Sequence, residues 1–294
     1  MAAPWPAPAA GPPGGGDVGG NGHTGAPQRL GVRCDRGCVR STAAMACSSG
    51  IRVGCSGWTY RHWRGAFYPD GMAVKRWFAF YAERFDTVEI NNSFYRLPKA
   101  ETFDGWRQQA PQGFRYAVKA NRFITQAKKL KECQEPMRRM MAPTRHLGPT
   151  LGPILYQLPP TLGINLERLE AFLLLLPADL IHVFEFRHAS WYTQTTLALL
   201  GRFGAGFVAH DLPGVASPRW ATGPAAYVRF HGGRGKYSGR YADESLLDWS
   251  DWMIAEEMAG RSVWAYFNND LAAAAVHDAQ TLKGILRRAR PQNS

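Results

Sequence analysis

The chain has 294 residues, of which 45% are hydrophobic and 12% aromatic, and its formal net charge is +12. That length and apolar content suffice for one large core, which excludes a chain that is disordered throughout. No apolar run is long enough to span a bilayer, and the first residues lack the charged start and apolar middle of a signal peptide. We therefore expect a cytoplasmic protein with no membrane segment.

Residues 1–50 differ from the rest, because they are rich in Gly, Pro and Ala and show little apolar periodicity. Such a segment buries too little apolar surface to offset the entropy lost on ordering. We predict a disordered extension over 1–50 and a single domain over 51–290. Because Met45 offers a second start, it stays open whether the extension is translated. Four arginines and two aspartates give the extension a charge of +2, so 12 − 2 = +10 remains on the rest.

Eight short apolar runs follow one another along the domain, and segments with helical spacing separate most of them. The apolar runs are 51–55, 87–90, 114–118, 154–158, 180–186, 206–209, 226–230 and 262–267. Helical spacing occurs over 74–85, 165–176, 192–203, 243–258 and 276–289. Alternating strands and helices predict an α/β fold with a parallel sheet, and eight strands predict a TIM-like (β/α) barrel.

The connection between the sixth and seventh strands breaks this alternation. Residues 212–224 contain Pro and Gly and have no helical pattern, so we expect a missing or reduced helix and an irregular barrel there. Elsewhere the helix signals are regular. Asp243 is the predicted N-cap of one helix, while Pro177 and Gly204 follow the ends of two others.

Polar, charged or aromatic residues follow the downstream end of every apolar run. The candidate site residues are Trp58, Glu89, Asn91, Tyr95, Lys119, Glu185, Arg187, His188, Trp191, Asp211, Arg229, His231, Asn268, Asn269 and Asp270. In a parallel barrel the carboxyl ends of the strands open onto one face, and that face holds the active site. The sequence therefore predicts a pocket at this rim.

Carboxylates and cations at the rim suggest acid/base chemistry on an anion. We predict Glu89 or Glu185 as general acid or base, and we count Asp211 and Lys119 as catalytic candidates as well. Lys119, Arg187 and Arg229 would hold a developing negative charge. An ion pair to Glu89 or Glu185 is the preferred interpretation of Lys119, and a Schiff base with a carbonyl substrate is the alternative.

Six aromatic residues lie beyond the strand ends, where their rings could stack on a sugar or a base. They are Trp58, Trp63, Tyr95, Trp191, Tyr237 and Tyr241. Core packing explains any one of them, but short loops cannot turn all six inward. We expect two or three to be exposed.

Two insertions add positive charge to the same face. Residues 121–148 carry a basic run with Met137, Met140 and Met141 on one side, which favours a solvated helix over an anion-binding lid. Residues 232–240 are glycine-rich and follow the seventh strand, where this fold often binds phosphate. Arg234, Lys236 and Tyr237 in that loop are therefore further ligand-binding candidates, although a flexible soluble loop explains them equally well.

Several motifs at consistent spacing resemble one known family. The motifs are Gly54-Cys55-Ser56-Gly57-Trp58, Val88-Glu89-Ile90-Asn91 with Phe94-Tyr95, Ala117-Val118-Lys119, Gln157-Leu158-Pro159-Pro160, Glu185-Phe186-Arg187-His188 with Trp191, Tyr227-x-Arg229-x-His231-Gly232, and Tyr266-Phe267-Asn268-Asn269-Asp270. Over about residues 51–288 the chain is similar to the YecE-like family, the domain of unknown function numbered 72. The resemblance implies a TIM-barrel-like fold and assigns no reaction. The chain departs from the family pattern at Gln126, where the family usually has His.

The sequence supports several functions. We favour an enzyme of the hydrolase or lyase class that acts on an anionic, phosphate-bearing small molecule or nucleotide fragment and needs no cofactor. The first alternative is a nucleic-acid-binding protein or a metal-dependent phosphoesterase, the second a non-catalytic binding module whose rim ions only neutralise one another. His188, His210, Asp211 and His231 with a glutamate would hold zinc or manganese, but the neighbouring cations disfavour a metal. The sequence does not indicate an oligomeric state.

Overall fold

A computed structural model of the chain describes residues 50–233, 235 and 237–289. Within them, eight strands form one parallel sheet in the order β1-β8-β7-β6-β5-β4-β3-β2, which confirms the TIM-like barrel. The strands are β1 (Ile51–Cys55), β2 (Thr87–Ile90), β3 (Arg115–Lys119), β4 (Leu151–Gln157), β5 (His182–Glu185), β6 (Gly206–His210), β7 (Ala225–Phe230) and β8 (Ser262–Phe267). The predicted extension lies outside the described residues apart from Gly50.

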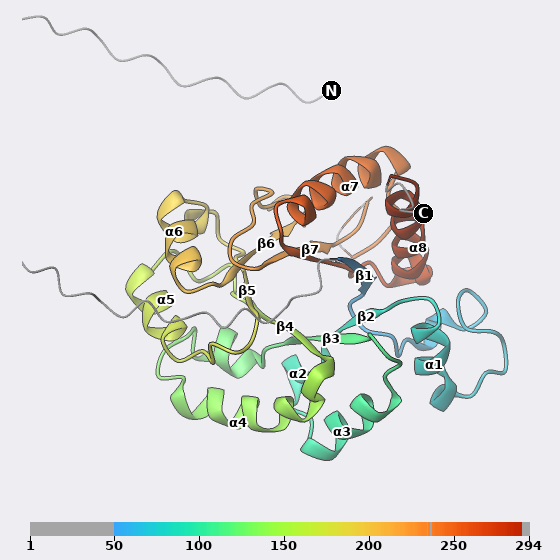
Figure 1. Cartoon of the computed structure of the whole chain (residues 1–294), viewed down its shortest axis with the longest axis horizontal. Coiled ribbons are helices and arrows are strands. Elements are labelled where there is room, and N and C mark those ends of the chain that lie inside the picture. The colour runs from blue at the N-terminus through green and yellow to red at the C-terminus, as the bar shows by residue number, and fades with distance from the viewer. Residues whose placement is uncertain (1–49, 234, 236, 290–294) are drawn as a thin grey trace, which may run out of the picture. The chain divides into compact units, whose positions relative to one another are not determined.

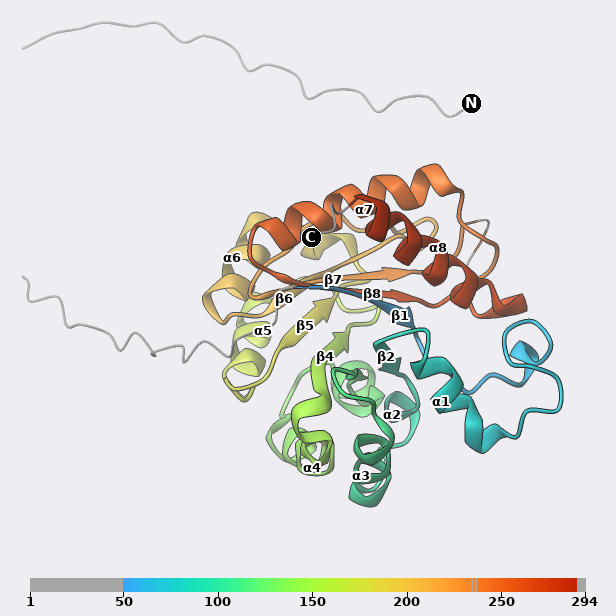
Figure 2. The same ribbon diagram turned by 45° about the vertical axis from the view of Figure 1, so that its right-hand side comes forward.

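Helices follow the strands and pack outside the sheet (Figure 1). They are α1 (Trp77–Ala82), α2 (Asn92–Tyr95), α3 (Ala100–Gln109), α4 (Gln134–Thr144), α5 (Leu166–Leu173), α6 (Gln194–Arg202), α7 (Asp243–Met258) and α8 (Ala274–Ala289). Figure 2 shows α7 and α8 on one side of the strands and α3 and α4 on the opposite side. None of the described helices is both long and apolar enough to cross a bilayer.

The irregular connection after β6 is confirmed, because residues 211–224 form no helix. Ser217 instead pairs with the end of β6. Its backbone N–H donates to the carbonyl oxygen of His210 at 2.8 Å, and its hydroxyl accepts the N–H of His210 at 2.8 Å. Trp220 from the same segment packs against Phe207 of β6, with ring centroids 5.6 Å apart. The segment thus covers β6 without a helix.

Some local predictions need correction. Ala242, not Asp243, is the N-cap of α7, and Asp243 lies in the first turn, where its charge complements the helix dipole. β4 begins at Leu151, three residues before its predicted start at 154, because Gly152 and Pro153 hide its apolar character. The predicted apolar side of the helix within 121–148 is confirmed, since the three methionines of α4 are buried.

The barrel closes between β1 and β2 through a side chain. No backbone ladder joins these two strands in the part of the chain that the structure describes. The hydroxyl of Tyr81 accepts the N–H of Cys55 at 2.8 Å and donates to the carbonyl oxygen of Thr87 at 3.0 Å. A glycine is required where β1 and β2 meet, because a Cβ on Gly54 would lie 2.2 Å from the carbonyl oxygen of Thr87. Tyr81 therefore replaces one rung of the ladder.

An apolar cluster fills the interior of the barrel below the charged residues. Its members are Ala117, Leu155, Val183, Val208, Ala225, Tyr227, Trp264 and Tyr266. In β7 the inward positions alternate, so that Tyr227 belongs to this cluster and Arg229 follows it toward the carboxyl end. The core therefore supports the charged residues from beneath.

Candidate functional site

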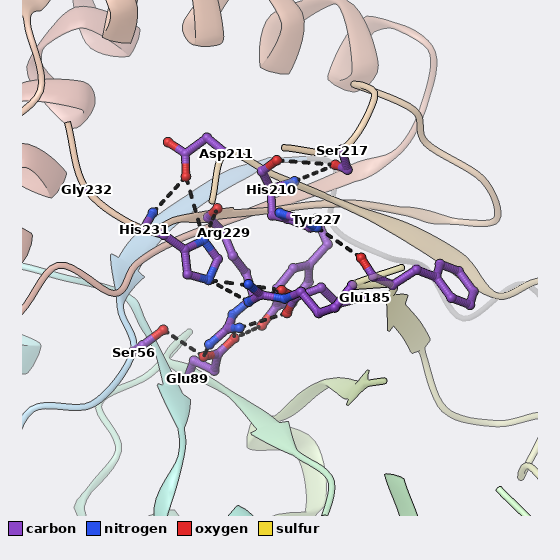
Figure 3. Close-up of polar contacts among 12 residues, drawn as sticks. Ser56, Glu89, Glu185, His210, Asp211, Ser217, Tyr227, Arg229, His231 and Gly232 are labelled. Atoms are coloured by element: carbon purple, nitrogen blue, oxygen red, sulfur yellow. Dashed lines mark hydrogen bonds and ion pairs between the residues drawn. The ribbon is translucent and has the colours of Figure 1, made fainter. Parts of the chain in front are cut away.

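Arg229 occupies the centre of the rim and is 1% exposed (Figure 3). Its Nε and Nη2 donate to the two oxygens of Glu89 at 3.1 and 2.8 Å, and its Nη1 donates to Glu185 Oε2 at 2.7 Å. Three inward positions on β7, β2 and β5 thereby form one buried ion network. A bidentate contact of this kind is strong and fixes the geometry of both groups.

Glu89 receives two further hydrogen bonds. Ser56 Oγ donates to Oε1 at 2.6 Å, and the hydroxyl of Tyr227 donates to Oε2 at 2.6 Å. Burial alone would raise the pKa of this carboxyl group, but the charge of Arg229 and the two hydroxyls outweigh it and hold the pKa below its ordinary value. Glu89 is thus a fully bonded carboxylate.

Glu185 is also held as a carboxylate. Its Oε1 forms an ion pair with Arg187 Nη2. Burial opposes its ionisation, yet the charges of Arg187 and Arg229 lower its pKa well below the ordinary value. The rim therefore holds a second carboxylate that is paired with two arginines.

His231 is a neutral imidazole whose tautomer the network fixes. Arg187 Nη2 can only donate, so the His231 Nε2 that it contacts at 2.8 Å is the acceptor. Nδ1 then carries the proton and donates to the carbonyl oxygen of Arg229 at 3.1 Å. Burial lowers the pKa of His231 to about 4, and the positive charge of Arg229 acts in the same direction.

Asp211 anchors the start of the glycine-rich loop. Its Oδ1 accepts the backbone N–H of His231 at 2.7 Å, and its Oδ2 accepts the hydroxyl of Tyr241, which in turn accepts the N–H of Gly232 at 2.8 Å. Gly232 is required by the packing of the loop itself, since a Cβ there would lie 2.2 Å from the carbonyl oxygen of Gly235. These contacts give Asp211 a positioning role.

Lys119, at the end of β3, stands apart from this network. Within the described residues its Nζ has neither an ion pair nor a hydrogen bond, and it lies 4.2 Å from the centroid of the Phe94 ring. The ion pair predicted with Glu89 or Glu185 does not form, because Arg229 and Arg187 occupy both carboxylates. Burial, reinforced by the charge of Arg229, lowers the pKa of Lys119 to about 7.

The rim also contains buried polar atoms without a partner in the described structure. Among them are Asn91 Oδ1, Arg187 Nε and His210 Nδ1. His210 Nε2 faces the carbonyl oxygen of Phe186 at 3.0 Å and must donate to it, which leaves Nδ1 as an acceptor. Buried groups of this kind ordinarily bind water or a ligand.

An open hollow of about 490 Å³ adjoins the rim between the loops after β2 and β3. Its lining residues are Phe94, Arg122, Gln126 and Ala127. Gln126, at the position of the family histidine, donates from Nε2 to the carbonyl oxygen of Gln157 at 2.8 Å and is thereby fixed. The hollow and Lys119 share Phe94 as a neighbour.

The remaining predicted residues are scattered. Trp191 is buried in the core and donates from Nε1 to the carbonyl oxygen of Leu162 at 2.8 Å. His188 is exposed and faces Ser190. Of the six loop aromatics only Tyr95, which is 70% exposed, is fully open, while Trp58 and Tyr237 are partly buried. The expectation of two or three exposed rings is therefore too high.

The residues after β8 and in the glycine-rich loop serve mainly structural contacts. Asn269 Nδ2 donates to the carbonyl oxygen of Gly239 at 2.9 Å and to Asp278 at 2.8 Å, and Asp270 lies 3.3 Å from His62. Asn268 is partly buried and its backbone N–H donates to Phe230 at 2.8 Å. Arg234 and Lys236 lie outside the described residues.

The predicted metal ligands do not converge. In the described part of the chain no three His, Cys, Asp or Glu side chains form a group that could hold a metal ion. Asp211 and His231 contact each other, with His231 Nδ1 3.6 Å from Asp211 Oδ1, whereas His210 faces the carbonyl oxygen of Phe186 through Nε2.

The candidate site residues included neither the residues that line the hollow nor Ser56 and Tyr227, although Ser56, Phe94 and Tyr227 stand in the motifs that resemble the family. Tyr227 lies two positions before Arg229 in the same strand, so strand alternation could have found it. Ser56 directly follows β1 at the rim. Arg122 carries no signal beyond its place after β3.

The comparisons with known proteins agree with this structure. The chain is 24% identical to the UPF0759 protein YunF of Bacillus subtilis, over 80% of the chain and 94% of YunF. It is 32% identical to the UPF0759 protein YecE of Escherichia coli over 115 residues, a match that spans 39% of the chain and only 42% of YecE.

Two solved structures share the fold. A DUF72 family protein from Thermotoga maritima has a TM-score of 0.71 at 26% identity, over 81% of this chain and 99% of that one. A DUF72 family protein from Enterococcus faecalis has a TM-score of 0.67 at 19% identity, over 81% and 96%. The family described as "Protein of unknown function DUF72" matches residues 52–294, and the chain therefore belongs to the DUF72 family.

Proposed function

We propose that the protein is an enzyme that binds an anionic small molecule at the barrel rim and uses Lys119 for acid/base chemistry. One observation carries the proposal. The two buried carboxylates of the rim are neutralised by two arginines, which leaves Lys119 as a cation with no counter-charge among the described residues. A partly buried cation without a counter-charge is costly unless an anion joins it or it loses its proton.

The charge arrangement assigns roles that differ from those expected at first. Glu89 and Glu185 have lowered pKa values and are occupied by their donors, so neither carries a proton to donate near neutral pH. With its pKa at about 7, Lys119 exchanges a proton at neutral pH and suits a general acid or base. The carboxylates would orient Arg229 and stabilise a cationic state of Lys119.

Ligand selectivity would come from the unpartnered polar groups of the rim. Arg187 Nε offers a donor, while Asn91 Oδ1 and His210 Nδ1 offer acceptors. A phosphorylated metabolite or nucleotide fragment carries both kinds of partner. This mixture favours a small polar molecule over a bare phosphate backbone, and so favours an enzyme over a protein that binds nucleic acid.

A thermal-shift screen of the full chain tests the proposal. The compounds are phosphorylated metabolites, nucleotides, keto acids, short oligonucleotides and divalent metals. We expect an anion to raise the melting temperature of the wild type, because a ligand of the folded state stabilises it. Lys119→Met should weaken that ligand by about tenfold or more, the loss of one charged hydrogen bond.

The matched control is Lys131→Met, which removes an exposed lysine from the same face. It should leave binding unchanged. A screen without any anionic ligand, or a ligand that Lys119→Met binds as well as the wild type, would overturn the proposal. Stabilisation by oligonucleotides or metals alone would favour the alternative functions instead.

A further inference from the structure

Lys119 and Arg122 frame one small region of the rim. Lys119 ends β3, Arg122 precedes the short π-helical turn Phe123–Ala127, and Phe94 of α2 contacts the first and lines the hollow with the second. We infer that Lys119 forms an imine with an anionic aldehyde or ketone whose negatively charged group binds Arg122. This rests on the proposed function and adds to it a substrate class and a covalent step.

A lysine attacks a carbonyl carbon only as the uncharged amine. The structure favours that form through burial, since Lys119 is partly buried and has no carboxylate partner in the described residues. The Phe94 ring that the amine faces acts in the opposite direction, because an aromatic face attracts a cation. With a pKa of about 7, against 10.5 for an ordinary lysine, about three quarters of Lys119 is uncharged at about pH 7.5, compared with about one in a thousand ordinary lysines. Partial exposure keeps the amine within reach of a small molecule.

Arg122 supplies the site for the negative group. Its side chain is exposed, lines the hollow of about 490 Å³ and makes no ion pair with any described residue. The chain around it is unusual, because a π-helical turn is followed by left-handed backbone at Lys129, Leu130 and Glu132. Rare conformations of this kind persist where the surrounding structure holds them, often at functional sites.

The covalent step balances without an oxidant. The amine nitrogen of Lys119 forms a bond to the carbonyl carbon, and the carbonyl oxygen takes up protons and leaves as water. The amine loses two hydrogens in exchange for the C=N bond, and one proton from solvent gives the iminium ion. Glu89 and Glu185, which lie beyond ion-pair contact but contribute attraction to Lys119, would stabilise this cation.

The experiment traps the imine on the full-length protein. The probes are pyridoxal 5′-phosphate and glycolaldehyde phosphate for a phosphate group, glyoxylate for a carboxylate, and glycolaldehyde as the neutral comparison. Borohydride reduces any imine to a stable amine, and peptide mass spectrometry then identifies the modified lysine. We expect Lys119 to be modified before any other lysine. The rates of modification by the phosphate and carboxylate probes then show which negative group the site prefers.

Lys283 is the internal control. It is a second lysine whose pKa burial lowers, but its Nζ donates to the carbonyl oxygen of Arg84 at 2.7 Å. We expect it to remain unmodified while Lys119 reacts. Lys119→Arg keeps the charge and removes the nucleophile, so it should abolish the dominant adduct.

Two further variants test the anion site. Arg122→Gln should slow modification by the anionic probes by about tenfold and leave that by glycolaldehyde unchanged. Arg139→Gln, at an exposed position on α4, should change neither rate. If Arg122→Gln and Arg139→Gln slowed modification by the anionic probes equally, the role of Arg122 would be overturned.

The outcomes separate this inference from the proposed function. If anions stabilise the wild type but no probe modifies Lys119 faster than Lys283, the imine is refuted and the proposed function stands. If neither stabilisation nor selective modification is seen, both are refuted. If glycolaldehyde reacts as fast as the anionic probes, the anionic substrate class is refuted.

Discussion

Replacing Lys119 by Met should stabilise the protein at neutral pH, although it should abolish function. The folded protein binds Lys119's proton less tightly than the unfolded chain, since the pKa falls from 10.5 to about 7. At 1.36 kcal/mol per pKa unit that difference amounts to about 4 kcal/mol near pH 7. Screening by water at the partly exposed side chain reduces it, so we expect a gain of about 2 kcal/mol.

The pH dependence follows from the same reasoning. Between pH 7 and 10.5 the unfolded state carries more protons at this position than the folded state, so wild-type stability rises with pH in that window. From about pH 7 to about pH 8.5 we expect a gain of about 1 kcal/mol in the wild type relative to Lys119→Met. The mutant serves as the control because it retains every other titrating group.

Urea denaturation of the full chain at both pH values measures these quantities. A Lys119→Met variant that is less stable than the wild type at pH 7 would refute the reasoning. So would parallel pH profiles for the two proteins, because they would mean that Lys119 has an ordinary pKa or an unseen counter-charge.

Three other changes probe the barrel and its rim, each measured by urea denaturation. Tyr81→Phe leaves the N–H of Cys55 and the carbonyl of Thr87 unpaired and should cost about 2–4 kcal/mol, whereas Tyr95→Phe on the surface should cost almost nothing. Glu89→Gln deprives buried Arg229 of its bidentate partner and should cost about 3–5 kcal/mol; a loss no larger than that of Glu132→Gln would contradict the network. Stability should fall as the pH drops from 6.5 toward 4, because burial lowers the pKa of His182 and His231 to about 4 and the unfolded chain takes up their protons first. His182→Gln should flatten that slope, and an unchanged slope would show that His182 is not held neutral.

The strands and most helices were predictable because their signals are local. Apolar runs bounded by polar clusters gave all eight strands, and the missing helix after β6 followed from its Pro and Gly content. The residues at the rim followed from one rule of the fold, that strand ends share a face.

The ion-pair partners within the rim were not predictable, because they depend on which cation the fold places next to each carboxylate. Arg229 sits at the centre and satisfies both glutamates, so Lys119 is left without the partner that the abundance of carboxylates suggested. The predicted exposure of the loop aromatic rings was wrong for a related reason. Trp191 follows a strand end, yet its indole turns inward to the carbonyl of Leu162. Only tertiary packing decides such choices.

The pKa of Lys119 tests the central claim most directly. Carbon-13 NMR of the Cε resonance of lysine-labelled protein, assigned with Lys119→Arg, follows the ionisation of this amine on its own. We predict a midpoint near pH 7, set by burial and the charge of Arg229. A midpoint near the ordinary value of 10.5 would contradict the account, because Lys119 would then be a permanently charged lysine with no reactive amine at neutral pH.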